Sequence, residues 1–150
     1  MLEVPKKIFN RKFEELEVGV NRLSFFSEEN LEKAQKGYRY DSNNNENSKW
    51  IGKEFVIIGN NMSLNEPIIA KTDDENIPIY NMVQDGLGSI EKIADSFDQY
   101  MEVLNLIKGT DLYRKDKIID LLDNIEEKVP EKSMYYWEDL INSAYNFLTD

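Results

Sequence analysis

Three apolar segments follow one another between residues 50 and 83, and the shortness of their connections restricts how they can pair. Parallel strands need crossover connections of a dozen or more residues, whereas these segments are joined by only NMSLN and DDE. Their isoleucine, valine and tyrosine content is typical of strands. The pattern predicts an antiparallel meander of three strands: WIGKEFVIIGN at 50–60, EPIIAKT at 66–72 and NIPIYNMV at 76–83. Pro78 cannot donate to a strand ladder, so we expect it at a sheet edge or near the start of its strand.

Two further elements are expected before this meander. VNRLSFF at 20–26 is rich in β-branched and aromatic residues, which predicts another strand. The following SEENLEKAQKG predicts a short helix that Ser27 caps and Gly37 closes. The polar stretch DSNNNENSK at 41–49 has nothing to bury and predicts a loop.

The second half of the chain shows helical periodicity. A helix over 90–107 is expected, with Ser89 as its N-cap and Gly109 at its end. Thr110 is expected to cap a helix in 111–129, which Pro130 ends. Residues 131–148 carry a second apolar stripe at helical spacing, which is far more often core than a cofactor site: Met134, Trp137, Ile141, Ala144 and Leu148. The expected fold is a single α+β domain over 1–150, an antiparallel sheet of about four to six strands packed against helices, with a helical C-terminal pair.

Two missing residue types limit the chemistry of this chain. Without cysteine there are no disulfides, thiolate nucleophiles or cysteine-based metal sites. Without histidine there is no Ser-His-Asp triad, so Ser96, although it stands between Asp95 and Asp98, lacks the usual base. We therefore expect a protein without catalytic activity and without a cofactor. No apolar run is long enough for a membrane span and no secretion signal is recognisable, so a cytoplasmic location is expected.

Acidic residues are concentrated in the later two thirds of the sequence. The net charge is −11; residues 1–48 carry 9 acids and 8 bases, whereas 49–109 and 110–150 each carry 10 acids and 5 bases. Such a field disfavours nucleic acid and favours a basic protein partner, because opposite charges accelerate encounter. The same excess of acid would also simply keep a surface soluble.

A surface that contacts a basic protein should combine exposed acids with one or two aromatic anchors. The candidate acids are Asp73, Asp74 and Glu75 in the turn before the third apolar segment, and Asp95, Asp98 and Glu102 on the polar side of the 90–107 helix. The candidate anchors are Tyr38, Tyr40 and Trp50, although a half-buried structural role is favoured for each of them, and most for Trp50, which is expected to begin a core strand. An alternative is that Asp73, Asp74 and Glu75 hold a hard metal cation. The argument against this alternative is that turns rich in such residues are common without any metal.

The order of several motifs resembles the SUKH superfamily, which includes fungal cell-wall synthesis regulators and bacterial toxin-immunity proteins. The most specific motif is IADSFDQYMEVL, which is similar to the closing helix of that family. It is accompanied by RLSFF, SEENLEKA, WIGKEFVIIGNN and PIIAKTDDENIPIYNMVQDG, so that the resemblance covers about residues 20–107. It implies an α+β fold and a binding role, most directly as an immunity protein that neutralises a cognate toxin, often a nuclease, by direct complex formation. A cell-wall regulator or scaffold is the alternative function.

The chain departs from the family pattern at both ends. Family members usually begin with two helices and an LPxxY-like segment, and neither is recognisable before Val20. A similar order of helix, proline, aromatic residues and helix stands instead in NIEEKVPEKSMYYWEDLI at 124–141. The C-terminal pair is therefore either a permuted replacement for the missing helices or an unrelated extension.

Overall fold

The sheet has six strands that follow each other in chain order, and every neighbouring pair is antiparallel. The structure is a computed structural model, and it describes residues 2–11, 13–83 and 89–149. The predicted antiparallel meander and the α+β class are confirmed. The strands are β1 Glu15–Val18, β2 Asn21–Phe25, β3 Phe55–Asn61, β4 Glu66–Lys71, β5 Ile79–Met82 and β6 Ile90–Ala94. Pro78 directly precedes β5, as expected for a residue that cannot donate to the ladder.

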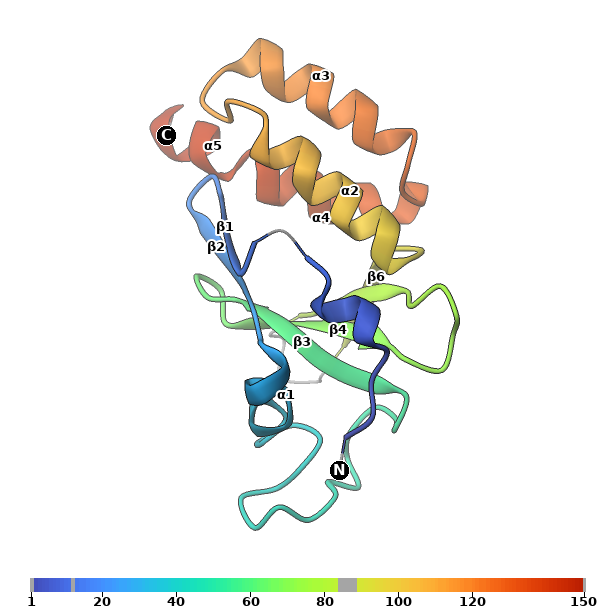
Figure 1. Cartoon of the computed structure of the whole chain (residues 1–150). Coiled ribbons are helices and arrows are strands. Elements are labelled where there is room, and N and C mark those ends of the chain that lie inside the picture. The colour runs from blue at the N-terminus through green and yellow to red at the C-terminus, as the bar shows by residue number, and fades with distance from the viewer. Residues whose placement is uncertain (1, 12, 84–88, 150) are drawn as a thin grey trace.

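Helices cover this sheet in two separate groups (Figure 1). The larger group follows the last strand: α2 Phe97–Lys108, α3 Lys115–Glu126, the short 3₁₀ helix η2 Glu131–Ser133, α4 Met134–Ile141 and α5 Ser143–Thr149. The smaller group consists of the 3₁₀ helix η1 Lys6–Phe9 and of α1 Glu28–Ala34, which lies at the opposite end of the view from α3. A polar loop after α1 leads into β3, in agreement with the loop predicted at 41–49.

The prediction of a helix over 90–107 is wrong in its first part. Residues 90–94 form β6, the last strand of the sheet, and the helix begins at Phe97. Ser89 therefore caps nothing; the N-cap is Ser96, whose hydroxyl accepts a hydrogen bond from the Gln99 backbone N–H at 3.0 Å. Asp95 precedes the helix and does not lie on its polar face. The predicted end at Gly109 is confirmed.

Smaller differences concern element boundaries. Trp50 does not begin a strand, since β3 starts only at Phe55. Thr110 is not the cap of the next helix: its hydroxyl donates to the Leu106 carbonyl at the end of α2, and α3 starts at Lys115. Strand β1 was not predicted, although its ELEV sequence alternates exposed and buried residues.

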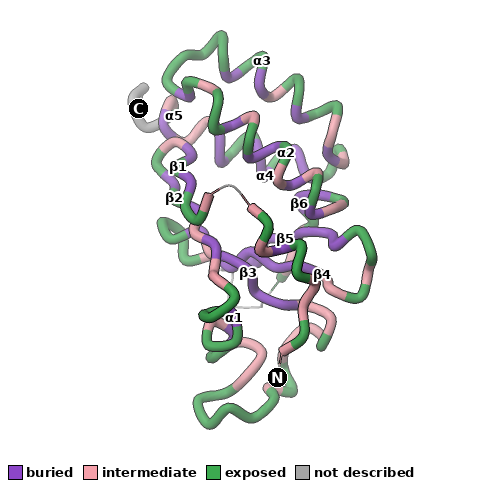
Figure 2. Tube along the Cα trace, in the orientation of Figure 1, coloured by how far each residue is buried: buried purple, intermediate pink, exposed green. Residues whose placement is uncertain are grey.

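The main core lies between the sheet and the larger helical group (Figure 2). Phe97, Tyr100 and Trp137 are at most 2% exposed, and the Trp137 indole N–H donates to the Ile93 carbonyl of β6 at 2.9 Å. The C-terminal helices thus share one core with the sheet. The C-terminal stripe is confirmed at Met134, Trp137, Ile141 and Ala144, while the side chain of Leu148 lies outside the described part of the structure.

The opposite face of the sheet carries a smaller apolar cluster. Ile57, Ile69 and Met82 are buried there. The loop that follows α1 contributes Tyr38, Trp50 and Ile51 to its cover. This second cluster explains why consecutive residues such as Val56 and Ile57 are both buried, since they point to opposite faces of the sheet.

Candidate functional site

The predicted acidic residues lie at the surface, but most of them are paired with lysine. The hydrogen bond from the Phe97 backbone N–H to the Asn76 carbonyl, at 3.0 Å, brings the acidic turn next to the start of α2. The ion pairs are Asp73–Lys71 at 3.6 Å, Asp95–Lys92 at 3.1 Å, Asp98–Lys7 at 2.6 Å and Glu102–Lys128 at 2.7 Å. Only Asp74 and Glu75 have no cation within reach among the described residues. The two predicted acidic groups are therefore neighbours, but together they carry little net charge.

The three predicted anchors are half-buried, and two of them, Tyr38 and Trp50, pack on the second face of the sheet. Tyr38 and Trp50 stack edge to face with ring centroids 6.4 Å apart, and the Trp50 indole N–H donates to the Phe55 carbonyl at 3.0 Å. Tyr40 lies beside the Arg39 guanidinium. Within the described part of the chain, no hydrogen bond or ring contact joins these aromatics to the predicted acids. We therefore assign Tyr38 and Trp50 to structure.

The turn of Asp73, Asp74 and Glu75 shows no cation-binding geometry. The Asp74 carboxylate accepts the Asn76 backbone N–H at 2.9 Å, which is an ordinary turn of this residue type. Over residues 2–11, 13–83 and 89–149, no group of three or more acidic side chains converges in a way that could hold a metal ion. The metal alternative at this turn therefore has no support from the geometry.

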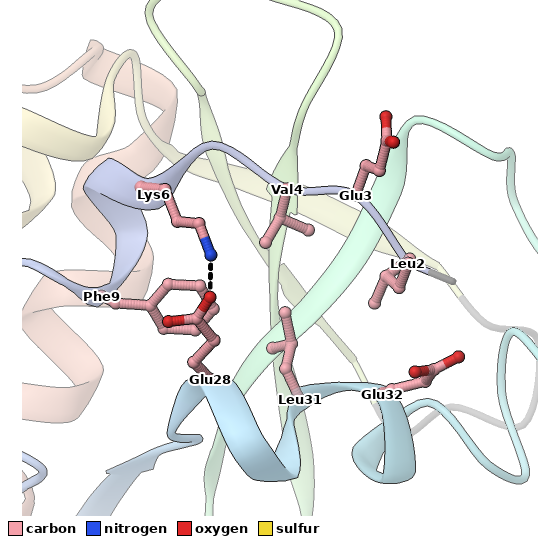
Figure 3. A pocket seen from close by; sticks show the side chains of 8 residues that line it. All are labelled: Leu2, Glu3, Val4, Lys6, Phe9, Glu28, Leu31 and Glu32. Carbon is pink, nitrogen blue, oxygen red and sulfur yellow. Dashed lines mark hydrogen bonds and ion pairs between the residues drawn. The ribbon is translucent and has the colours of Figure 1, made fainter.

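A groove that was not predicted from the sequence lies between the N-terminal segment and α1 (Figure 3). Its volume is about 500 Å³, which is within the range of ligand-binding pockets. Leu31 of α1 and Val4 of the N-terminal segment point into it from opposite walls. Its other lining side chains are the apolar Leu2 and Phe9 and the charged Glu3, Lys6, Glu28 and Glu32.

The N-terminal wall is held in place by its own side chains. Ile8 in η1 is 1% exposed and belongs to the main core. The Arg11 guanidinium donates to the carbonyls of Ile8 at 2.7 Å and of Phe26 at 2.5 Å, which ties η1 to the end of β2. Burial lowers the pKa of Arg11, against the smaller opposing effect of Glu14. This wall is therefore a fixed element rather than a loose terminus.

The α1 wall is attached through a buried glutamine. Gln35 is fully buried, and its side-chain amide accepts the Ile57 backbone N–H at 2.9 Å and donates to the Ile57 carbonyl at 2.7 Å. Strand β2 pairs only with the far end of β3, at Gly59 to Asn61. Gln35 therefore takes the place of a neighbouring strand at Ile57, and this fixes α1 beside the sheet edge.

The charges around the groove are unbalanced. Lys6 forms an ion pair with Glu28 that closes one end of the groove (Figure 3). Glu3 and Glu32 are exposed and have no cationic partner among the described residues. An apolar floor with a carboxylate rim fits a side chain that has an aliphatic stem and a cationic head, such as lysine or arginine.

The sequence contained only a weak signal for this site. Glu28 and Glu32 fit the ordinary excess of acid near a helix N-terminus. Nothing in MLEVPKKIF shows that it folds back against α1, because the contacts that place it come from residues more than a dozen positions away, as with Arg11 and Phe26.

The chain matches no protein-family model, no curated protein and no solved structure. In the part of the chain that the structure describes, none of the helices is both long and apolar enough for a membrane span.

Proposed function

We propose that this chain is a non-catalytic binding protein that neutralises a basic toxin domain, such as a nuclease, by direct complex formation. The observation that carries the proposal is the groove between the N-terminal segment and α1, with its apolar floor and its uncompensated glutamates. The resemblance of residues 20–107 to the SUKH superfamily supports the same class of function.

The groove has the two properties that a protein interface needs. The apolar side chains of Leu2, Val4 and Phe9 are half-buried, so a partner that covers them gains hydrophobic free energy on binding. The carboxylates of Glu3 and Glu32 attract a positively charged partner during encounter and then pair with its cations. Phe9 adds an aromatic face, which favours a cationic group lying over it.

The net charge of the whole chain acts in the same direction. With a net charge of −11, the molecule attracts a basic partner at long range, and the groove supplies the specific site to which the partner binds. Such steering raises the association rate and weakens as salt is added.

The proposal is tested by measuring the binding of a basic toxin domain encoded beside this gene, using stopped-flow association at several salt concentrations. We expect the double variant Glu3→Lys/Glu32→Lys to associate on the order of tenfold more slowly and with a flatter salt dependence. Phe9→Ala should instead accelerate dissociation, because it removes a buried contact and no charge.

The matched control is Asp120→Lys/Asp123→Lys on the exposed side of α3, which changes the net charge by the same amount. We expect this control to slow association by much less than the groove variant. Equal effects of the two double variants would show that only total charge matters and would remove the groove from the proposal. Reversal of Asp73, Asp74 and Glu75 tests the acidic turn in the same assay.

A further inference from the structure

The two edges of the sheet differ in how their backbone groups are bonded. At the edge formed by β6, the Ser133 hydroxyl donates to the Lys92 carbonyl at 2.7 Å, and the Trp137 indole N–H donates to the Ile93 carbonyl at 2.9 Å. Side chains of η2 and α4 therefore bond to the β6 edge. Strand β1 forms the other edge of the sheet, where its one neighbouring strand is β2.

The register fixes which backbone groups of β1 point away from the sheet. The Phe25 backbone N–H donates to the Glu14 carbonyl at 2.8 Å. Along an edge strand in an antiparallel ladder, residues bonded to the partner strand alternate with residues whose backbone groups point outward. The N–H and C=O groups of Glu15 and Glu17 therefore point outward. Within the described ranges, no other residue forms a hydrogen bond with these outward groups.

The side chains along β1 also alternate. Glu15 and Glu17 are exposed, whereas Leu16 and Val18 are buried in the main core. Glu17 pairs with Arg22 of β2 at 3.0 Å, while Glu15 has no cationic partner among the described residues. A strand added at this edge would place every second side chain beside the two carboxylates and the others on the opposite face.

We infer that β1 binds an extended segment of a basic protein by strand addition, and that cationic and apolar residues alternate in this segment. The backbone of the segment pairs with the outward groups of Glu15 and Glu17, which supplies the main-chain hydrogen bonds of the complex. Its cationic side chains lie beside the two carboxylates, and opposite charges on neighbouring strands stabilise the pairing. Its apolar side chains lie on the face that carries the helices.

The same charges oppose a second copy of this chain as the occupant. Two β1 strands paired antiparallel around Leu16 would place Glu15 of each copy opposite Glu17 of the other. Like charges in directly opposite positions destabilise a pair of strands. Charged side chains on an edge strand commonly prevent such self-pairing. The edge therefore favours a cationic strand and discriminates against its own sequence.

This surface is separate from the groove, and the inference does not depend on the proposed function. The turn between β1 and β2 lies beside α5 (Figure 1), where the Val20 backbone N–H donates to the Ser143 hydroxyl at 3.1 Å. The groove lies between the N-terminal segment and α1. A change at the Glu15 and Glu17 amides therefore reports binding at β1 and not in the groove.

The test is hydrogen exchange of single amides, followed by NMR on the whole chain, with a capped peptide of alternating lysine and valine as the probe. In the free chain, the Glu15 and Glu17 amides should exchange much faster than those of Leu16 and Val18, which are bonded to β2. Millimolar peptide should slow exchange at Glu15 and Glu17. A control peptide of alternating glutamate and valine should give no such protection.

Two variants separate backbone pairing from charge. Glu15→Pro removes an outward N–H and leaves the ladder to β2 intact, since edge strands accept proline at such positions, and it should abolish the protection at Glu17. Glu15→Gln keeps the N–H and removes one charge, so it should weaken peptide binding several-fold. The matched control Asp120→Asn on α3 makes the same change in net charge and should leave peptide binding nearly unchanged.

Four results would overturn the inference. Slow exchange of the Glu15 and Glu17 amides in the free chain would show that the edge is already covered. Absence of added protection with the lysine–valine peptide, or equal protection with the glutamate–valine peptide, would remove the cationic strand. Protection that grows with protein concentration alone would identify a second copy as the occupant. Unchanged binding by Glu15→Pro would exclude backbone pairing; if that variant does not fold, Glu15→Gln and the two peptides decide.

Discussion

The two helical groups cover the same sheet to very different degrees. The C-terminal group places Phe97, Tyr100 and Trp137 on the sheet with at most 2% exposure. The N-terminal group contributes single buried side chains, Ile8 from η1 and Leu31 from α1, and leaves a groove of about 500 Å³ between its two segments. The C-terminal group includes two amphipathic helices of 12 residues each, whereas η1 has four residues and α1 has seven, so the N-terminal group presents less apolar surface to the sheet. The C-terminal group therefore closes the main core, and we propose that the N-terminal group provides a surface for binding.

The strongest test of this division is removal of part of the C-terminal group. Deletion of residues 131–150 takes Trp137, Leu140 and Ile141 from the main core and exposes the apolar sides of α2, α3 and β6. We expect an aggregating or molten chain with poor amide dispersion in NMR spectra and with strong binding of a hydrophobic dye. Sharp, dispersed amide resonances from the shortened chain would show that these helices are an appendage.

A pair of core truncations compares the two groups more quantitatively. Phe97→Ala should lower the free energy of unfolding by about 3–5 kcal/mol, because the packed core cannot collapse into the cavity that the removed ring leaves. Leu31→Ala should cost less, about 2 kcal/mol, because its site borders the groove and water can enter. Urea unfolding measures both changes. An equal or larger loss for Leu31→Ala would mean that the α1 side is as tightly closed as the C-terminal side.

Helix capping gives a smaller contrast between the same two groups. Ser96 caps α2 through its hydroxyl, so Ser96→Ala should cost about 1 kcal/mol of unfolding free energy. Ser27 occupies the equivalent position of α1, but its hydroxyl accepts from the Asn30 side chain and makes no capping bond. We expect Ser27→Ala to cost only a few tenths of a kcal/mol in the same thermal or urea titration. Similar losses at the two serines would contradict the assigned caps.

The smallest expected effect is a pH dependence that arises from Glu91. Because the folded state raises the pKa of this carboxyl above its ordinary value of 4.5, the folded chain binds that proton more tightly than the unfolded chain does. The contribution of Glu91 to stability is therefore full at low pH and is lost as the pH rises from about 4.5 through the raised pKa. Glu91→Gln should flatten this part of the stability profile in urea titrations at a series of pH values, measured without divalent cations. An unchanged profile would mean that Glu91 titrates in the folded state as it does in the unfolded one.

The sheet and the amphipathic helices could be predicted from the sequence, but the junction between them could not. Ile90, Ile93, Ala94 and Phe97 keep a helical spacing across the boundary, so periodicity alone extends α2 backwards into β6. The available signal was local: in Ser96-Phe-Asp-Gln99 the serine accepts from the Gln99 N–H, and the Gln99 side chain accepts from the Asp95 N–H at 2.8 Å. This is a variant of the capping box, which marks a helix start at Phe97.

The groove could not be predicted in the same way. It consists of residues that are distant in the sequence, such as Leu2 and Leu31, and only the docking of the N-terminal segment beside α1 brings them together. The predicted acids were correctly placed at the surface. Two of their lysine partners, Lys7 and Lys128, lie far away in the sequence, so these two pairings could not be foreseen.

Hydrogen–deuterium exchange of the chain with and without the proposed basic toxin domain tests the division of roles most directly. We expect binding to slow exchange in residues 2–11 and 28–35, the two walls of the groove, and to leave exchange in α3 and α4 nearly unchanged. Protection gained on α3 and α4, with none along the groove, would contradict it and would place the interface on the C-terminal helices.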